Sequence, residues 1–179
     1  MKKLSIIILF IITCGAINYA QSIGIGPQIG YYKSQDADNP SAMLGVALRV
    51  KLTNSLGIEG SINYKKEEFA NGNVKTTSYP LMATALIYFI PIVYGTAGAG
   101  WYNVKYEYSA SYKQNGLRDE TTQKFGYHFG GGVELPFGNV TLIGDIRYVF
   151  LNLKLDNLPV KESLKSNFYV ITAGILFKI

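Results

Sequence analysis

Hydrophobic and polar residues alternate along most of the chain after residue 22, which is the period of β-strands rather than of helices. Turn-forming residues separate the alternating segments at regular intervals, and no segment shows a convincing helical period. The pattern predicts eight strands, most of them long enough to cross a bilayer at a tilt, which takes about 9–11 residues. The predicted strands span residues 23–32, 43–52, 56–65, 80–89, 93–108, 121–135, 140–151 and 167–179.

The predicted connections alternate between short and long. The short ones are residues 53–55, 90–92 and 136–139, and the long ones are residues 33–42, 66–79, 109–120 and 152–166. Outer-membrane barrels combine short turns on one side with long loops on the other, whereas soluble β-proteins have no physical reason to keep this order. The chain is therefore expected to be all-β, an eight-stranded antiparallel up-and-down transmembrane β-barrel.

Charged residues in the predicted strands fall on the face opposite to the apolar one. With the apolar parity taken as outward, the inward set is Arg49, Lys51, Glu59, Lys65, Lys105, Glu107, Lys124, Glu134, Asp145, Arg147 and Lys178. Random placement would divide these residues about evenly between the faces. A soluble barrel hides its apolar face, whereas a barrel in lipid turns that face outward. The alternative is a secreted soluble β-sandwich.

The same parity rule makes specific assignments on the strand predicted at 93–108. It places Trp101 in the lumen and turns four neighbouring side chains to the lipid: Tyr102, Val104, Tyr106 and Tyr108. Tyrosines are enriched where a barrel wall crosses the membrane–water interface. We expect interface girdles to include Tyr102, Tyr106, Tyr108, Tyr127 and Tyr148.

Charges enclosed by eight strands need partners, because such a barrel has room only for its own side chains. The turn centred on Asn54 sets Arg49 opposite Glu59, which predicts a cross-strand ion pair. Arg147 follows Asp145 by two residues and shares its face.

The candidate site is a set of lumen charges: Arg49, Glu59, Glu134, Asp145 and Arg147. Its three negative and two positive charges leave room for a further cation, Lys51 or Lys105. We interpret the set as a structural network that fixes strand register, with an ion-conducting polar thread as the alternative.

The first twenty residues form a separate unit. Lys2 and Lys3 precede an uncharged run at 4–16, and Ala20 supplies a small residue at a cleavage point, which is the order of a secretory signal. We expect a signal peptide at residues 1–20 and the barrel domain at 21–179. A lipoprotein site at Cys14 is the alternative, although the β-branched Thr13 before it disfavours that site.

Composition narrows the possible chemistry further. One cysteine and one histidine exclude a disulfide scaffold and a structural zinc site, and no motif indicates a cofactor or a metal. The predicted external loops carry equal numbers of basic and acidic residues, which argues against a strong polyanion-binding surface, and no nucleic-acid partner is expected. Loop lysines just above the membrane are expected to pair locally and weakly with lipopolysaccharide phosphates.

The last third of the chain resembles the OmpA-type small outer membrane β-barrels. In residues 125–148, a Gly-x-Gly-x-Glu pattern ends at Glu134, and an acidic-x-Arg-Tyr pattern follows from Asp145 to Tyr148. The terminal alternation through Phe177 and Ile179 is similar to the strand that outer-membrane assembly machinery recognises, although this family usually ends in Phe. The resemblance implies a porin-like outer membrane protein of a Gram-negative bacterium, exported through the periplasm, with membrane lipids and the assembly machinery as partners.

We expect a structural or surface-interaction role without catalysis, since similar barrels serve many purposes. One alternative is a narrow channel for small or hydrophobic solutes. Another is a lipid-modifying outer membrane enzyme, for which His128 would be the only available histidine. Small barrels that deacylate lipid A have a serine two residues after the histidine, whereas this chain has Gly130, so we expect His128 to be a lumen histidine.

Overall fold

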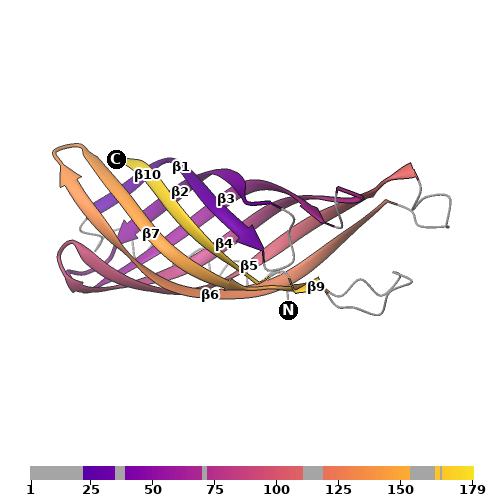
Figure 1. Ribbon diagram of the computed structural model, residues 1–179. Coiled ribbons are helices and arrows are strands. Elements are labelled where there is room, and N and C mark those ends of the chain that lie inside the picture. The colour runs from indigo at the N-terminus through magenta and orange to yellow at the C-terminus, as the bar shows by residue number, and fades with distance from the viewer. Residues whose placement is uncertain (1–21, 35–38, 70–71, 111–118, 154–163, 166) are drawn as a thin grey trace, which may run out of the picture.

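The computed structural model describes residues 22–34, 39–69, 72–110, 119–153, 164–165 and 167–179 (Figure 1). The wall of the molecule is built from eight long strands: β1 (Ser22–Ser34), β2 (Ser41–Lys51), β3 (Leu56–Phe69), β4 (Val74–Ile90), β5 (Val93–Tyr108), β6 (Glu120–Phe137), β7 (Val140–Phe150) and β10 (Phe168–Lys178). The short strands β8 (Asn152–Leu153) and β9 (Leu164–Lys165) pair only with each other. The predicted signal peptide at 1–20, with Cys14, lies outside the described residues.

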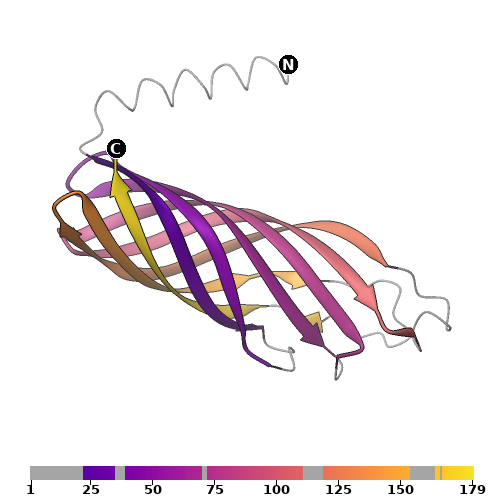
Figure 2. The same cartoon turned by 90° about the horizontal axis from the view of Figure 1, so that it is seen from above.

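The eight long strands close into a barrel in the order β1-β10-β7-β6-β5-β4-β3-β2, and every neighbouring pair is antiparallel (Figures 1 and 2). The predicted eight-stranded up-and-down barrel is therefore confirmed. β1 begins and β10 ends at the same end of the barrel as the β2–β3, β4–β5 and β6–β7 connections. We call this the turn end and the opposite one the loop end.

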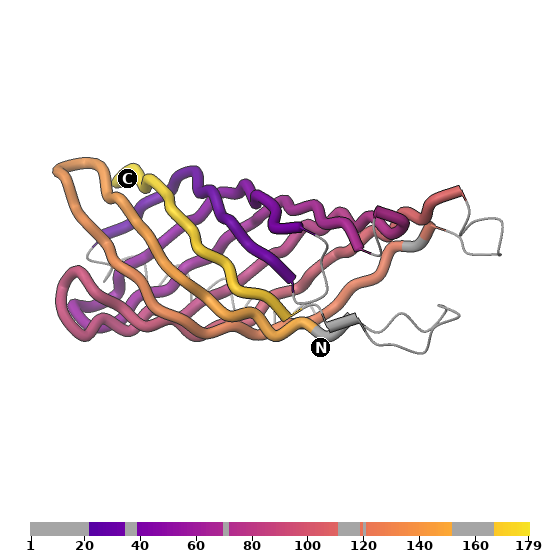
Figure 3. The backbone as a smooth tube through the Cα atoms, in the orientation of Figure 1, coloured from indigo at the N-terminus to yellow at the C-terminus, as the bar shows by residue number. Residues whose placement is uncertain are grey.

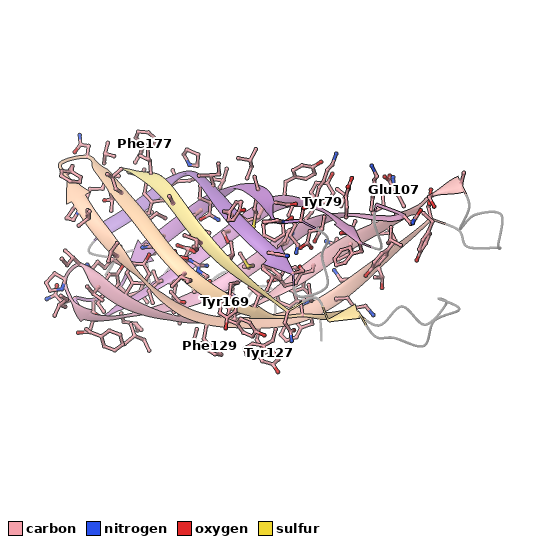
Figure 4. The ribbon with its side chains drawn as sticks, in the orientation of Figure 1. Tyr79, Glu107, Tyr127, Phe129, Tyr169 and Phe177 are labelled. Carbon is pink, nitrogen blue, oxygen red and sulfur yellow. The ribbon has the colours of Figure 1, made fainter. Side chains whose placement is uncertain are left out.

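Side chains alternate between the outside and the inside of the wall. On β4, Leu81 and Phe89 lie on the outer face, whereas Thr84 and Leu86 are buried. Large aromatic side chains labelled in Figure 4 point away from the barrel, among them Tyr127. The outward assignments made from the sequence are confirmed on every long strand except β5.

On β5 the predicted faces are inverted. Trp101 is 46% exposed on the outer face, although the sequence placed it in the lumen. Lys105 and Glu107 also point outward, with Lys105 Nζ 2.7 Å from Glu107 Oε1, so these two charges do not belong to the lumen. The four side chains expected to face lipid are all buried: Tyr102, Val104, Tyr106 and Tyr108.

The inversion arises because the outer face of the barrel becomes polar toward the loop end, and the second half of β5 lies in this polar part. Successive rows on the outer face of β4, β5 and β6 run Leu81–Trp101–Phe125, Tyr79–Asn103–Gln123 and Thr77–Lys105–Thr121. The outer face thus changes from apolar to polar within three rows. Beyond this change the apolar side chains turn inward, as they do in a sheet whose outer face meets water. The predicted tyrosine girdle keeps Tyr127 and Tyr148 on the outer face but loses its β5 members.

Strands at the loop end are longer than predicted. β3 and β4 pair as far as Phe69 and Val74, so the long connection predicted at 66–79 is wrong and shrinks to residues 70–73. Gly72 there has a φ of +79°, a turn conformation that other residues rarely adopt. β5 and β6 rise farther from the barrel than the other strands (Figure 3).

The seam between β1 and β10 is interrupted at Pro27. After Ile25 the ladder resumes only at Gln28, because proline has no N–H to donate. Gly26 lies so close to β10 that a Cβ atom there would sit 1.8 Å from the Ile175 carbonyl oxygen. A residue with a side chain would therefore push the closing strands apart.

The loop half of the lumen is filled by an apolar cluster, which we call the plug. Its members are Tyr32, Met43, Phe69, Val74, Met82, Tyr102, Val104, Tyr106, Tyr108, Val149, Leu151, Phe168 and Val170. One buried ion pair accompanies the plug, with Lys65 Nζ 3.1 Å from Glu67 Oε2. The larger set of buried charges, which includes Arg49, Glu59 and Arg147, lies in the turn half. The plug separates the turn-half charges from the loop end of the barrel.

Candidate functional site

The lumen charges are organised around the pair Arg49 and Glu59. The two residues face each other in the β2–β3 ladder, and both are buried. Arg49 donates from Nε and Nη2 to Glu59 Oε2, with the Nε bond 3.0 Å long. The ion pair expected from the Asn54 turn is formed.

Glu59 also holds the second arginine of the lumen. Arg147 Nη2 donates to Glu59 Oε1 at 2.8 Å, so the two carboxylate oxygens serve different guanidinium groups. Arg147 Nε donates to Asp145 Oδ1 at 2.7 Å along β7. One buried carboxylate on β3 thereby connects β2 to β7 across the interior.

Glu134 completes the network from β6. Arg49 Nη1 donates to Glu134 Oε2 at 3.0 Å, and Tyr88 Oη donates to the same oxygen at 2.6 Å. Lys51 Nζ lies 3.8 Å from the other oxygen of Glu134 and 4.0 Å from the ring centroid of Tyr88. Lys51, and not Lys105, is therefore the cation that balances the set, and the three acids face three bases.

Neutral side chains that the sequence analysis did not single out complete the site. Thr172 Oγ1 donates to Asp145 Oδ1 at 2.8 Å, and Tyr94 Oη lies 3.2 Å from Arg49 Nη2. Thr172 is the register partner of Asp145, so a ladder drawn from the sequence could have found it. Tyr94 reaches its partners across the lumen, which no ladder indicates.

The long polar side chains fit into the lumen because glycines lie opposite them in the strand ladders. Gly132 is the register partner of Asp145, and a Cβ atom on Gly132 would lie 2.7 Å from Tyr94 Oη. Gly98 has the same relation to His128, where the Cβ atom would lie 2.7 Å from Nε2. Glycine at these positions leaves room for the long polar side chains opposite.

His128 lies inside the barrel and is 2% exposed. Its Nε2 is 2.9 Å from Thr84 Oγ1, and its Nδ1 has no hydrogen-bond partner among the described residues. Arg147 Nη1 donates to the same threonine hydroxyl at 3.4 Å. The ring thus faces the lumen as the sequence parity predicted, and no serine hydroxyl bonds to it in the described part of the chain.

The lumen offers little space at its turn end. A cleft lined by Arg49, Lys51, Glu134 and Lys178 has a volume of about 20 Å³, close to the space that one water molecule needs. The described residues contain no cluster of histidine, cysteine and acidic side chains suited to a metal ion. What the geometry supports is a rigid, charge-balanced cross-brace, since each acid contacts at least one base.

The outer wall differs completely from the lumen. On β4 the outer face between Tyr79 and Phe89 carries only uncharged side chains. The outer faces of the neighbouring described strands are likewise uncharged at this level of the barrel, which we call the apolar zone. Aromatic side chains border this zone at both ends, with Tyr79 and Tyr169 on the loop side and Phe89 and Phe177 on the turn side (Figure 4). The described residues contain no helix with the length and apolar character needed to cross a bilayer.

The sequence matches a family model described as outer membrane protein beta-barrel domain over residues 6–177. That match covers nearly the whole chain, including all of the strands that build the lumen charges. No curated protein matches the chain significantly.

Several solved structures have a similar fold. The outer membrane protein OprG from Pseudomonas aeruginosa has a TM-score of 0.65 at 10% identity, with 90% of this chain and 97% of that chain covered. Neisserial surface protein A has a TM-score of 0.62 at 14% identity, with 89% and 99% covered. Ail, the attachment invasion locus protein of Yersinia pestis, has a TM-score of 0.52 at 17% identity, with 88% and 97% covered. At such identities the similarity establishes the barrel fold alone.

Proposed function

Because the chain belongs to the outer membrane protein beta-barrel domain family, we propose that it is an integral outer membrane protein with a structural or surface-interaction role and no catalytic turnover. The observation that carries the proposal is the contrast between an uncharged outer wall and a charged lumen. In water this arrangement would expose a broad apolar surface, whereas in lipid it buries that surface.

The proposed orientation follows from the two ends of the barrel. Short turns face the periplasm in barrels of this kind, and longer loops face the outside. The turn end, where β1 begins and β10 ends, is therefore periplasmic, and the β5–β6 projection reaches outward. Residues 1–20 act as the export signal in this proposal, and the mature chain contains no cysteine.

The partners that fit this placement are the outer membrane lipids, including lipopolysaccharide, and the outer-membrane assembly machinery. Lys66 and Lys105 lie on the outer face just beyond the aromatic border, where phosphates of the outer leaflet would be in reach. Ile171, Ile175 and Phe177 form the outward face of the closing strand β10, which the assembly machinery would read. No nucleic-acid partner is proposed.

A closed lumen favours the structural role over a channel. The plug fills the loop half, and in the turn half Arg49, Arg147 and Lys51 are each paired with an acid. A continuous water path would require both layers to open. A lipid-modifying enzyme would need its histidine on the lipid-facing wall, whereas His128 faces the lumen.

Recordings in planar lipid bilayers test the closed lumen. We expect the wild-type protein to insert without discrete conductance steps. A variant with a truncated plug, Tyr102→Ala combined with Tyr106→Ala and Phe168→Ala, is expected to conduct, because these large side chains are fully or almost fully buried in the lumen. Reproducible unitary steps from the wild-type protein would contradict the proposal and favour the narrow channel.

A further inference from the structure

At the tip of the β5–β6 projection, the described part of the chain pairs with β6 on one side only. β5 pairs with β6 as far as Tyr106 and Glu120, whereas β7 first pairs with β6 at Tyr127. Gly126 is buried against Leu151, so the edge without a described partner comprises residues 120–125. Among the described residues, no chain segment pairs with this edge.

The opposite side of the projection is different. β3 also extends past its last pair with β2, which joins Met43 and Lys65. There the end of β1 contacts the edge, since Tyr32 Oη donates to the Lys66 carbonyl at 2.7 Å and the Ser34 N–H donates to Glu67 Oε1 at 3.2 Å. One backbone carbonyl of the β3 edge, that of Lys66, is therefore bonded within the molecule. Along residues 120–125 of β6, by contrast, no described residue bonds to the backbone on the side away from β5.

An open strand edge presents alternate backbone N–H and C=O groups to any extended chain. Natural proteins usually blunt such edges with proline, bulges or several charges. Residues 120–125 contain no proline, their ladder with β5 runs without a register shift, and their charged residues are Glu120 and Lys124. Thr121, Thr122 and Gln123 keep the edge polar yet compatible with strand pairing.

We propose that residues 120–125 of β6 dock an extended peptide segment of a partner outside the cell, which adds as a strand and carries an acidic residue opposite Lys124. The proposal rests on the proposed outer-membrane placement, which puts the projection outside. Backbone hydrogen bonds would supply the affinity, and alternate side chains would supply the selectivity.

Charge complementarity selects the acidic residue. Lys124 is half-buried on the inner side of the edge, its register partner is the buried Tyr102, and it forms no ion pair or hydrogen bond with any described residue. An opposite charge directly across a strand pair is favourable, so a carboxylate on the added strand would satisfy Lys124. On the outer side, Gln123 already donates to Asn103 Oδ1 at 3.1 Å, so that face favours polar neighbours.

A second copy in the same membrane fits less well than a separate peptide. All copies share one orientation across the bilayer, so two β6 edges would run parallel to each other. Parallel pairing is slightly less stable per residue than antiparallel pairing, and two Lys124 side chains would meet. A free extended segment can take the antiparallel direction and bring the carboxylate.

Amide hydrogen exchange followed by NMR in lipid nanodiscs tests the proposal. The probe is a synthetic octapeptide of alternating threonine and valine with one central glutamate. We expect this peptide to slow exchange at alternate amides within residues 120–125. A peptide with lysine in place of glutamate should bind about two- to fivefold more weakly, the range of a cross-strand charge pair. The Lys124→Glu variant should reverse this preference, and Lys75→Glu at an exposed position of β4 should leave it unchanged.

Three outcomes would overturn the docking proposal. The first is no protection by the glutamate peptide, and the second is no reversal of preference in Lys124→Glu. The third is protection of the edge without any peptide, which would mean that the chain itself or a second copy covers it, and dilution of the protein distinguishes these two. Failure to insert into nanodiscs would instead contradict the proposed membrane placement, so the two failures are separable.

Discussion

Glu59 shows how much of the lumen depends on one carboxylate. It accepts hydrogen bonds from Arg49 through one oxygen and from Arg147 through the other, and it is 2% exposed. Its removal would leave the buried network with an excess positive charge. Breaking one partner out of a buried ion pair is costly because the remaining charge has no compensation.

We therefore predict that Glu59→Gln lowers the free energy of unfolding by about 3 kcal/mol or more. Reversible urea unfolding in lipid vesicles measures the change. The control is Glu68→Gln, which removes the exposed pair with Lys75 and should cost at most about 1 kcal/mol. Equal effects of the two substitutions would contradict a stabilising network in the lumen.

At this scale the sequence could indicate neighbours along a ladder but not contacts across the lumen. The pairing of Arg49 with Glu59 follows from their equal distance to the turn, and Arg147 with Asp145 follows from strand parity. The bond from Arg49 to Glu134 joins β2 to β6 through the interior. Such a contact depends on barrel closure and on side-chain reach, which alternation does not describe.

Strand β5 is the element where sequence parity misleads. Its upper half lies beyond the apolar zone, so the rule that apolar residues face lipid is reversed there. The sequence does contain a signal of this change. Lys105 and Glu107 share a face with Trp101, so one face of the strand passes from an apolar residue to charged ones along its length. Where a strand passes from lipid into water, its outer face must change from apolar to polar residues.

Cysteine labelling tests the faces of β5. In vesicles, Lys105→Cys should react quickly with a charged, water-soluble maleimide, because its outer face meets water. Tyr106→Cys should react at least tenfold more slowly, because Tyr106 is fully buried in the plug. The mature chain contains no cysteine in our proposal, so each variant carries a single thiol. Faster labelling of Tyr106→Cys would restore the face assignment first made from the sequence.

The connections show the same limit of local patterns. Residues 66–79 were predicted as one of the long connections, yet most of them extend β3 and β4. Polar segments can still form strands where their outer face lies in water and where a neighbouring strand offers backbone hydrogen bonds. Strand lengths at the loop end were therefore beyond what hydrophobic alternation predicts, whereas the turn-end connections were close to their observed bounds.

At the scale of the whole molecule, a single layer of strands separates the apolar outside of the barrel from its lumen. An uncharged outer wall surrounds a charged lumen half and an apolar plug. The placement of apolar side chains outside and charged side chains inside was predictable from the sequence, because the charged residues of the strands other than β5 all fall on one face. The docking edge and the plug were not, because they depend on where individual strands stop pairing.

A charge placed on the outer wall should destabilise the protein according to depth. Ala85 lies on the outer face of β4 between the aromatic borders, so Ala85→Arg should cost about 2–4 kcal/mol of unfolding free energy in lipid vesicles. Thr77→Arg, on the same strand beyond the border, should cost less than about 1 kcal/mol. A penalty that does not differ between the two positions would contradict a lipid-facing zone on β4.

The most direct test of the account is to ask what touches the outer wall. Single nitroxide labels at Thr77, Leu81, Thr84 and Ala85 in lipid vesicles report collisions with oxygen, which partitions into lipid, and with a water-soluble nickel chelate. We predict frequent oxygen and rare nickel collisions at the outward-facing Leu81 and Ala85, the reverse at Thr77, and few collisions of either kind at the buried Thr84. Nickel collisions at Ala85 as frequent as those at Thr77 would show that water reaches the wall, and would contradict the account.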